Sequence, residues 1–242
     1  MKKVFFALVA LVCSMSMKAQ VMKVMKGKTV VAIYRAEEAD NVVFEEAQAS
    51  TTTGTAKRRG NIEVKWVQLW ENGPKFAEHN VGATSATEAG GYYYWGSSID
   101  KDKAYSYNTD MDTLTGSDDT ATNLWGNNWR MPTEAELKAL LSNCDVAWTD
   151  NYKESGKKGI IFTGKGEFAS NRVFFPTTGQ FVGFANIVHM PDYDGYYWSS
   201  TPVWITGPRS AQVLHFAPNY DARVEYNDRD TGFCVRAVLA EN

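Results

Sequence analysis

The sequence predicts an α+β fold with short antiparallel strands, few helices and long loops. Three observations lead to this prediction. Apolar residues make up 44% of the 242-residue chain, which is enough to supply a core and excludes a disordered chain. From Asn61 onward, short apolar or aromatic runs alternate with Gly, Asn, Asp and Pro, as strands alternate with turns. Only Thr133–Ser142 has the spacing of an amphipathic helix.

Residues 1–19 predict a secretory signal peptide. Lys2 and Lys3 are followed by an apolar run, Val4–Val12, that is too short to span a bilayer, and Ala19 is a small residue suited to cleavage. We therefore expect an exported protein, located at the cell surface or outer membrane or outside the cell. A lipoprotein acylated at Cys13 stays open, although a smaller residue than valine is expected before such a cysteine.

The charge of the exported chain argues against nucleic acid as a partner. The chain has 25 basic and 28 acidic residues, and loss of residues 1–19 removes three lysines and no acid. The remaining 22 basic and 28 acidic residues give a net charge of −6, with no basic face in the sequence. No later apolar run is long enough for a transmembrane segment. The oligomeric state is left open.

Residues 20–46 are expected to form a small β-rich module. Val21–Met25 and Thr29–Tyr34 are predicted strands on either side of a Gly-Lys turn, and Ala36–Asp40 is interpreted as a helical turn. A unit this small buries too little surface to stand alone, so we expect it to pack on the main domain or on a partner. Residues 47–60 are small, polar and finally basic, which predicts a flexible linker.

The main domain is expected over residues 61–242. Its helix is predicted at Thr133–Ser142, because Thr133 and Glu136 have the spacing of a capping box and Leu137 and Leu140 share one face. The predicted strands are the apolar or aromatic runs Val64–Leu69, Tyr92–Trp95, Val173–Phe175, Tyr196–Trp198, Val213–Phe216 and Phe233–Val238.

Cys144 and Cys234 remain after removal of the signal peptide. Export places them where disulfides persist, so the pair is a candidate disulfide. Such a bond would close a loop of about ninety residues and contribute roughly 4 kcal/mol to stability. The alternative is two separate buried thiols, which behave as small apolar side chains.

Five segments occur together in a recognisable order: WVQLWENGPKFAEHNVGATS, GGYYYWGSS, LWGNNWRMPTEAELKALLSNC, YYWSSTP and GFCVRAV. They resemble the Fibrobacter succinogenes major paralogous domain and the related DUF1566-type domains. These families are part of the wider C-type-lectin-like and formylglycine-generating-enzyme-like fold group. The resemblance covers about residues 61–240, and it implies a C-type-lectin-like domain whose task is binding.

The same residues do not imply an enzyme. Formylglycine-generating enzymes need a reactive cysteine pair, and neither Cys144 nor Cys234 lies where the resemblance would place it. His79, His189 and His215 are far apart and lack the spacing of metal ligands. The chain contains no nucleophile-elbow, zinc-protease or phosphate-loop motif. We therefore expect no catalytic activity and no cofactor.

In C-type-lectin-like domains the last third of the chain forms the ligand face, which implies Gly195–Gly232 here. Tyr, Trp and Arg are enriched at binding hot spots, and aromatic faces stack on sugar rings. The expected ligand-binding residues are Tyr197, Trp204, Arg209, His215, Asn219, Tyr220, Arg223, Tyr226 and Arg229. A glycan and a surface protein are both open as ligands. An envelope, adhesin or fimbria-associated subunit and a diversified receptor of the retroelement type are the alternatives.

The charged residues suggest further roles. Oxygen donors for calcium stand close together at Asp221, Glu225, Asn227, Asp228 and Asp230, so a calcium site is a minor alternative. Asp118 and Asp119 are interpreted as part of a solvated loop. Arg236 is expected to pair with Glu134 or Glu136, and Arg130 to bind backbone carbonyls of a long loop.

Overall fold

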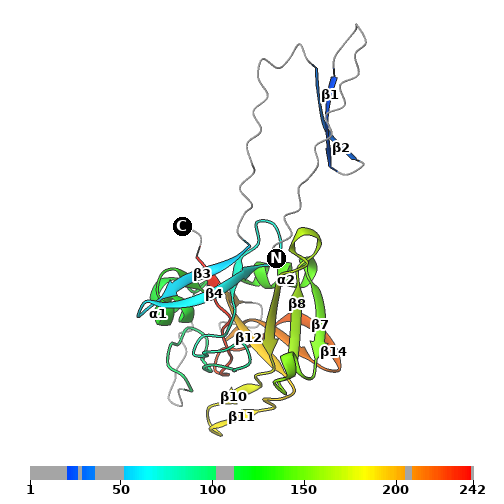
Figure 1. Ribbon diagram of the computed structural model, residues 1–242. Helices are drawn as coiled ribbons and strands as arrows, with labels where there is room; N and C mark the ends of the chain where they lie inside the picture. Colours follow the sequence, from blue (N-terminus) through cyan, green and yellow to red (C-terminus); the bar gives the residue numbers. More distant parts are fainter. Residues whose placement is uncertain (1–20, 27–28, 36–51, 102–111, 205–208, 241–242) are drawn as a thin grey trace. The chain divides into compact units, whose positions relative to one another are not determined.

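The computed structural model describes residues 21–26, 29–35, 52–101, 112–204 and 209–240. The chain divides into two units, Met1–Ser50 and Thr51–Asn242. The predicted α+β class is confirmed, because the described residues form antiparallel sheets with few helices (Figure 1). No helix in the described residues is long and apolar enough to cross a membrane.

The first unit contains an antiparallel hairpin. Strand β1 (Val21–Lys26) pairs with β2 (Thr29–Arg35), from Val21 opposite Arg35 to Lys26 opposite Thr29. The two strands predicted here are confirmed. The predicted signal peptide, with Cys13, and the helical turn at Ala36–Asp40 lie outside the described residues.

The second unit begins with a strand where a linker was predicted. Strand β3 (Thr53–Arg58) pairs with β4 (Ile62–Gln68) through a turn in which Gly60 and Asn61 both have positive φ. The prediction of a linker over residues 47–60 is therefore wrong for residues 53–58. The glycine and small polar residues that predicted flexibility also suit this hairpin, since they tolerate the left-handed backbone of a tight turn.

Strand β3 is the edge of a five-stranded sheet, ordered β3-β4-β5-β15-β6. Its remaining members are β5 (Lys75–Ala77), β6 (Trp129–Arg130) and β15 (Val238–Leu239). Of the predicted strand Phe233–Val238, only Val238 lies in a strand, β15, whereas Phe233 and Cys234 form isolated bridges. The predicted strand Tyr92–Trp95 is likewise reduced to a bridge between Tyr93 and Phe233.

The described residues of the second unit form three further sheets. One contains β7 (Asp145–Thr149), β8 (Gly159–Thr163) and β9 (Arg172–Pro176) in that order. A second contains β12 (Gly195–Val203), β13 (Ser210–Ala217) and β14 (Tyr220–Asp228). The third is a small hairpin of β10 (Gln180–Val182) and β11 (Ile187–His189).

Two α-helices lie within the described residues. Helix α2 (Glu134–Asn143) confirms the predicted helix, and Thr133 and Glu136 form the expected capping box. Helix α1 (Thr120–Trp125) was not predicted. It begins at Asp119, whose carboxylate accepts hydrogen bonds from the backbone of Thr122 (2.9 Å) and Met131 (2.8 Å). Asp119 is buried, so its interpretation as a solvated residue is wrong.

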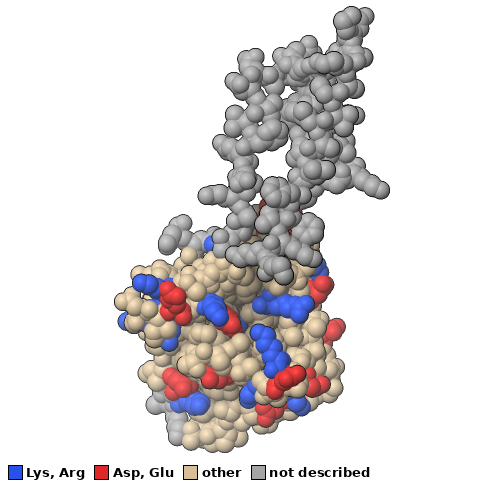
Figure 2. Space-filling view, in the orientation of Figure 1, with Lys and Arg blue, Asp and Glu red and all other residues tan. Residues whose placement is uncertain are grey.

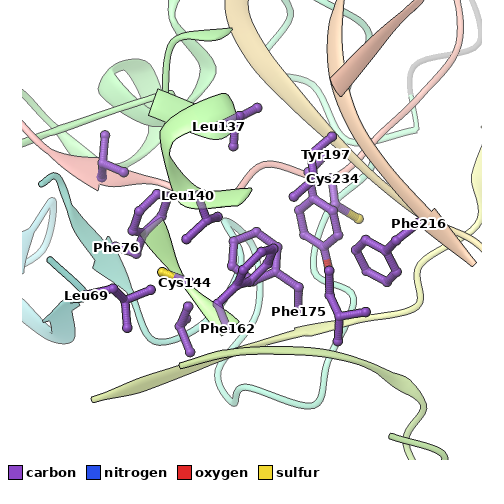
Figure 3. Close-up of a cluster of buried hydrophobic side chains, with 14 of the residues drawn as sticks. Leu69, Phe76, Leu137, Leu140, Cys144, Phe162, Phe175, Tyr197, Phe216 and Cys234 are labelled. Carbon is purple, nitrogen blue, oxygen red and sulfur yellow. The ribbon is translucent and has the colours of Figure 1, made fainter. Parts of the chain in front are cut away.

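Strands β12 and β13 are buried on both faces, so their alternate residues, which point to opposite sides, enter two different parts of the core. Tyr197, Leu214 and Phe216 enter one apolar cluster, and Trp198 and Val213 enter the other. In the first cluster, Leu140 of α2 lies among Phe76, Phe162 and Phe175 (Figure 3). The helix packs against the β12–β14 sheet and shares this cluster with strands β5, β8 and β9.

Cys144 and Cys234 are both free and buried in the first cluster, so the candidate disulfide is not formed. Their sulfur atoms stand apart in Figure 3, with aromatic side chains drawn between them. Burial raises the pKa of the Cys144 thiol to about 12, and burial also raises the pKa of Cys234 far above its usual range. Both residues therefore behave as apolar core side chains.

The buried thiols should be unreactive in the folded protein. We expect the peptides that contain Cys144 and Cys234 to escape alkylation by iodoacetamide in native buffer and to be alkylated fully in concentrated urea. Thiolate formation and access are both required for the reaction, and burial suppresses both. Mass spectrometry of the digested protein measures the result. Rapid alkylation of either peptide in native buffer would contradict the packing described here.

Glu136, which was predicted as a partner of Arg236, is bound by Arg130 in the structure. Arg130 binds Glu136 through two hydrogen bonds, of 2.7 and 2.6 Å. Arg236, which was expected to bind this helix, is fully buried and donates instead to the carbonyls of Ala77, Glu78 and Phe174. Its Nε donates to Asn80 Oδ1 (2.7 Å). The pairing predicted for Arg236 is therefore wrong, whereas Arg130 donates to the Met131 carbonyl (3.1 Å) as well as to Glu136. The final segment of the chain places Arg236 deep between β5 and β9, away from α2.

Glu136 should make the stability of the fold depend on pH in the acidic range. Burial alone would raise the pKa of Glu136, but hydrogen bonds from Arg130 and Thr133 and the Arg130 charge outweigh burial and lower the pKa below 4.5. A lowered pKa means that the ionised group stabilises the fold above pH 4.5 and that this stabilisation is lost as pH falls through the folded pKa.

The matched variant Glu136→Gln should lower the free energy of unfolding by about 1–2 kcal/mol at pH 7, since it keeps the size of the side chain and removes the charge. The difference from the wild type should shrink as the pH falls below 4.5. Urea unfolding at several pH values measures it. If the difference in unfolding free energy between wild type and variant stays constant down to pH 3, the Glu136 charge does not stabilise the fold.

Candidate functional site

The structure divides seven of the nine predicted ligand-binding residues between two ends of the β12–β14 sheet. His215, Tyr220 and Arg223 lie at the end where β12 begins and β13 ends, with Asn219 in the adjoining turn. Trp204, Arg209 and Arg229 lie at the opposite end, beside the pair Val203–Ser210. Strand pairing therefore creates two separate groups of side chains instead of one continuous face.

The first group is centred on His215. Because β13 pairs with both neighbours, Tyr196, His215 and Arg223 stand side by side across the sheet. The Tyr196 ring stacks on the imidazole with centroids 3.9 Å apart, and it also stacks on Phe233 at 4.7 Å. The imidazole is thus held in one plane, with its edge directed at polar neighbours.

Both nitrogens of His215 have partners. Nδ1 donates to Glu225 Oε1 at 2.5 Å, since a carboxylate can only accept. Nε2 contacts the Tyr220 hydroxyl and lies 3.4 Å from Asp194 Oδ1. Arg223 Nε donates to the other oxygen of Glu225 at 2.6 Å. The group is a closed network of two carboxylates, an imidazole, a phenol and a guanidinium.

The network is mostly shielded from water. The side chains of His215 and Asp194 are 6% and 12% exposed, whereas that of Arg223 is 52% exposed. Burial raises the pKa of Tyr196 to about 12, and burial with the Asp194 charge raises the pKa of Tyr220 still further. Both phenols therefore stay protonated at neutral pH, and the Tyr220 hydroxyl can donate a hydrogen bond to its neighbours in the network. Arg223, stacked 4.6 Å above the Tyr220 ring, is the part of the network that solvent reaches.

The second group is a stack of aromatic and guanidinium planes. Arg229 is fully buried, 4.1 Å from the Trp95 ring centroid and 5.6 Å from that of Trp204. Its Nε donates to the Ser210 carbonyl at 3.0 Å, which fixes the guanidinium in place. Trp204 is the outer member of the stack and is 50% exposed. Arg209 is exposed beside it, and its carbonyl accepts the Arg229 backbone N–H.

Two of the nine residues belong to neither group. Tyr197 is buried in the core, where its hydroxyl donates to the Pro176 carbonyl at 2.6 Å, so a ligand at the surface does not reach it. Tyr226 is 55% exposed and lies opposite Gln212, on the other face of the sheet from His215. The sequence did contain a signal for this division. Successive residues of a strand point to opposite faces, so Tyr196 and Tyr197 lie on different faces of the sheet, as do Arg223 and Tyr226.

The acidic residues considered for calcium lie along a strand, not around a loop. Asp221, Glu225 and Asn227 occupy alternating positions of β14, so their side chains are spaced by roughly 7 Å per two residues. Glu225 is already bound to His215 and Arg223. No group of three His, Cys, Asp or Glu side chains in the described part of the chain is arranged to hold a metal ion.

A third feature was missed by sequence reasoning. A groove of about 700 Å³ opens between the β3–β4 hairpin and the β7–β9 sheet. Its lining comes from segments far apart in the sequence, including Lys65, Tyr152, Lys153 and Arg172. No motif joins these residues, and Thr53–Thr55 were assigned to a linker. Only the pairing of β3 with β4 reveals that they form one wall.

Comparisons with protein-family models, with curated proteins and with solved structures found no match to this chain.

Proposed function

We propose that this chain is an exported, non-catalytic binding protein of the bacterial cell surface, which binds a glycan at the Trp204 end of the β12–β14 sheet. The domain is then of the C-type-lectin-like kind that the five sequence segments resemble. Export is proposed from the basic and apolar residues of the first nineteen positions.

The observation that carries the proposal is the exposed, supported ring of Trp204. A half-exposed tryptophan on a buried guanidinium offers a flat apolar surface whose orientation is already fixed. A preorganised side chain loses little conformational entropy when a ligand binds, and aromatic faces stack on sugar rings. The exposed side chain of Arg209, next to the paired residues Ser210 and Val203, supplies a polar group at the same end of the sheet.

The His215 network supports a binding role more than a catalytic one. A general base needs a nitrogen that is free to take a substrate proton, and each His215 nitrogen already has a protein partner. The network instead orders the far end of the sheet and presents Arg223 at the surface. In this proposal it stabilises the face and carries out no chemistry.

A glycan array screened with the purified protein, in calcium and again in chelator, tests the function. We expect binding that is insensitive to chelator, because the acidic side chains of β14 are spaced along the strand and do not converge on one point. Binding that chelator abolishes would contradict the metal-independent mechanism. A blank array would contradict the glycan ligand, and capture of a surface protein would then identify the class of partner.

A further inference from the structure

The groove between β3–β4 and the β7–β9 sheet is a second candidate site, independent of the Trp204 face and of the function proposed for it. Its volume of about 700 Å³ lies within the range of small-ligand sites, roughly 300–1,000 Å³. On the face shown in Figure 2, Lys and Arg side chains gather over the part of the molecule that carries β4 and β8 in Figure 1.

The walls of the groove are fixed to each other. Asn171, which is buried, donates from Nδ2 to the Gln68 carbonyl at 2.7 Å and so joins the loop before β9 to the end of β4. The Gln68 N–H in turn donates to the Thr52 carbonyl at 2.8 Å, which holds the start of β3. The groove is therefore built by hydrogen bonds across its floor and needs no ligand to form.

The lining is positively charged although the chain as a whole is acidic. Lys65, Lys153 and Arg172 face one acid, Glu78, whereas the chain carries a formal net charge of −3. Lys65 and Glu78 are 3.9 Å apart and largely exposed, so this pair contributes little. Neither Lys153 nor Arg172 forms an ion pair with an acid among the described residues. Two cations thus remain available to an anion.

The rest of the lining suits a sugar ring. Tyr152 is stacked on Phe174 with centroids 3.9 Å apart and planes 4° apart, which fixes its ring. The Lys153 ammonium is 5.2 Å from the Tyr152 centroid, and its residue has a left-handed backbone (φ 47°) that places it there. Hydroxyl groups line the same groove at Thr53, Thr55, Thr149 and Ser170. Apolar floor, hydroxyls and unpaired cations together match a hydroxylated ring that carries an anionic group.

We propose that this groove binds an anionic oligosaccharide, with Arg172 and Lys153 bound to its carboxylate or sulfate and Tyr152 against a sugar ring. A guanidinium binds either oxyanion through parallel hydrogen bonds, so the shared chemistry is a charged group on a hydroxylated ring.

Calorimetric titration of the purified protein tests the proposal with three tetrasaccharides: a hyaluronan fragment with carboxylates, a κ-carrageenan fragment with sulfates, and neutral chitotetraose. We expect one of the charged probes to bind and chitotetraose to bind at least about 10-fold more weakly, with affinity that falls as salt rises. The charged probe that binds identifies the anionic group. No binding by either charged probe, or equal binding of all three, would overturn the proposal.

Two double variants locate the binding. The double variant Arg172→Gln with Lys153→Gln should lower the affinity for the charged probe at least about 10-fold, because it removes both cations proposed to bind the anionic group. Lys138→Gln with Lys165→Gln removes the same charge from exposed positions outside the groove and should leave the affinity unchanged. Trp204→Ala should also leave it unchanged, which separates this site from the proposed glycan face. Equal losses of affinity in the two double variants would show that binding depends only on the net charge of the protein, and this result would overturn the proposed site.

Discussion

Replacement of Arg236 by alanine should lower the free energy of unfolding by about 3–5 kcal/mol, the largest loss expected from any single substitution considered. Arg236 is fully buried and makes four hydrogen bonds of 2.7–3.0 Å to Asn80, Ala77, Glu78 and Phe174. Its guanidinium also lies 4.5 Å from the Phe175 ring centroid. Alanine would leave three carbonyls and an amide oxygen buried without this donor, and would leave a cavity.

Burial lowers the pKa of Arg236 to about 10, so the side chain is still charged at neutral pH. Lysine keeps a positive charge but lacks the planar fork, so Arg236→Lys should rescue only part of the loss. Urea unfolding, with the exposed Arg209→Ala as the control, measures both. Arg209→Ala should change stability by less than about 0.5 kcal/mol. Equal stability of the Arg236 and Arg209 variants would contradict the role given to Arg236.

Replacement of Trp204 by alanine should weaken glycan binding about 30-fold, which corresponds to a loss of roughly 2 kcal/mol. The half-exposed ring offers an apolar surface at that end of the sheet, and Arg229 lies against it. Trp204→Phe keeps an aromatic plane and should retain most of the affinity. Titration of a glycan from the array measures both variants, and thermal unfolding shows whether they remain folded.

The matched control is Phe184→Ala. Phe184 is 98% exposed in the turn of the β10–β11 hairpin, so it is another aromatic side chain open to solvent. Its removal should leave glycan affinity unchanged. Loss of binding in Phe184→Ala together with unchanged binding in Trp204→Ala would move the site to the hairpin and contradict the proposal.

Local sequence signals predicted the elements that depend on local interactions. The capping box of Thr133 and Glu136 and the leucines after it identified α2, because helix caps and faces are encoded within a few residues. Apolar runs identified β4, β9, β12 and β13 for the same reason. Strand β3 was missed because its sequence is small and polar, and its pairing with β4 buries little of it.

The partners of charged residues could not be predicted locally. Arg236 contacts residues more than one hundred and fifty positions away at Ala77, Glu78 and Asn80, which only the assembled sheets bring near. Asp119 is an N-cap whose helix lacks a strong apolar period. The sequence predicted most residues of the candidate site. Their division into a His215 end and a Trp204 end depends on the register of β12, β13 and β14, which the sequence did not reveal.

Hydrogen–deuterium exchange with and without a glycan from the array tests most directly whether the ligand binds at the Trp204 end of the β12–β14 sheet. We predict that the ligand slows exchange at residues 203–204, 209–212 and 226–229, and leaves α2 and the β10–β11 hairpin unchanged. Protection confined to the hairpin, to α2 or to the far end of the sheet around His215 would contradict the claim.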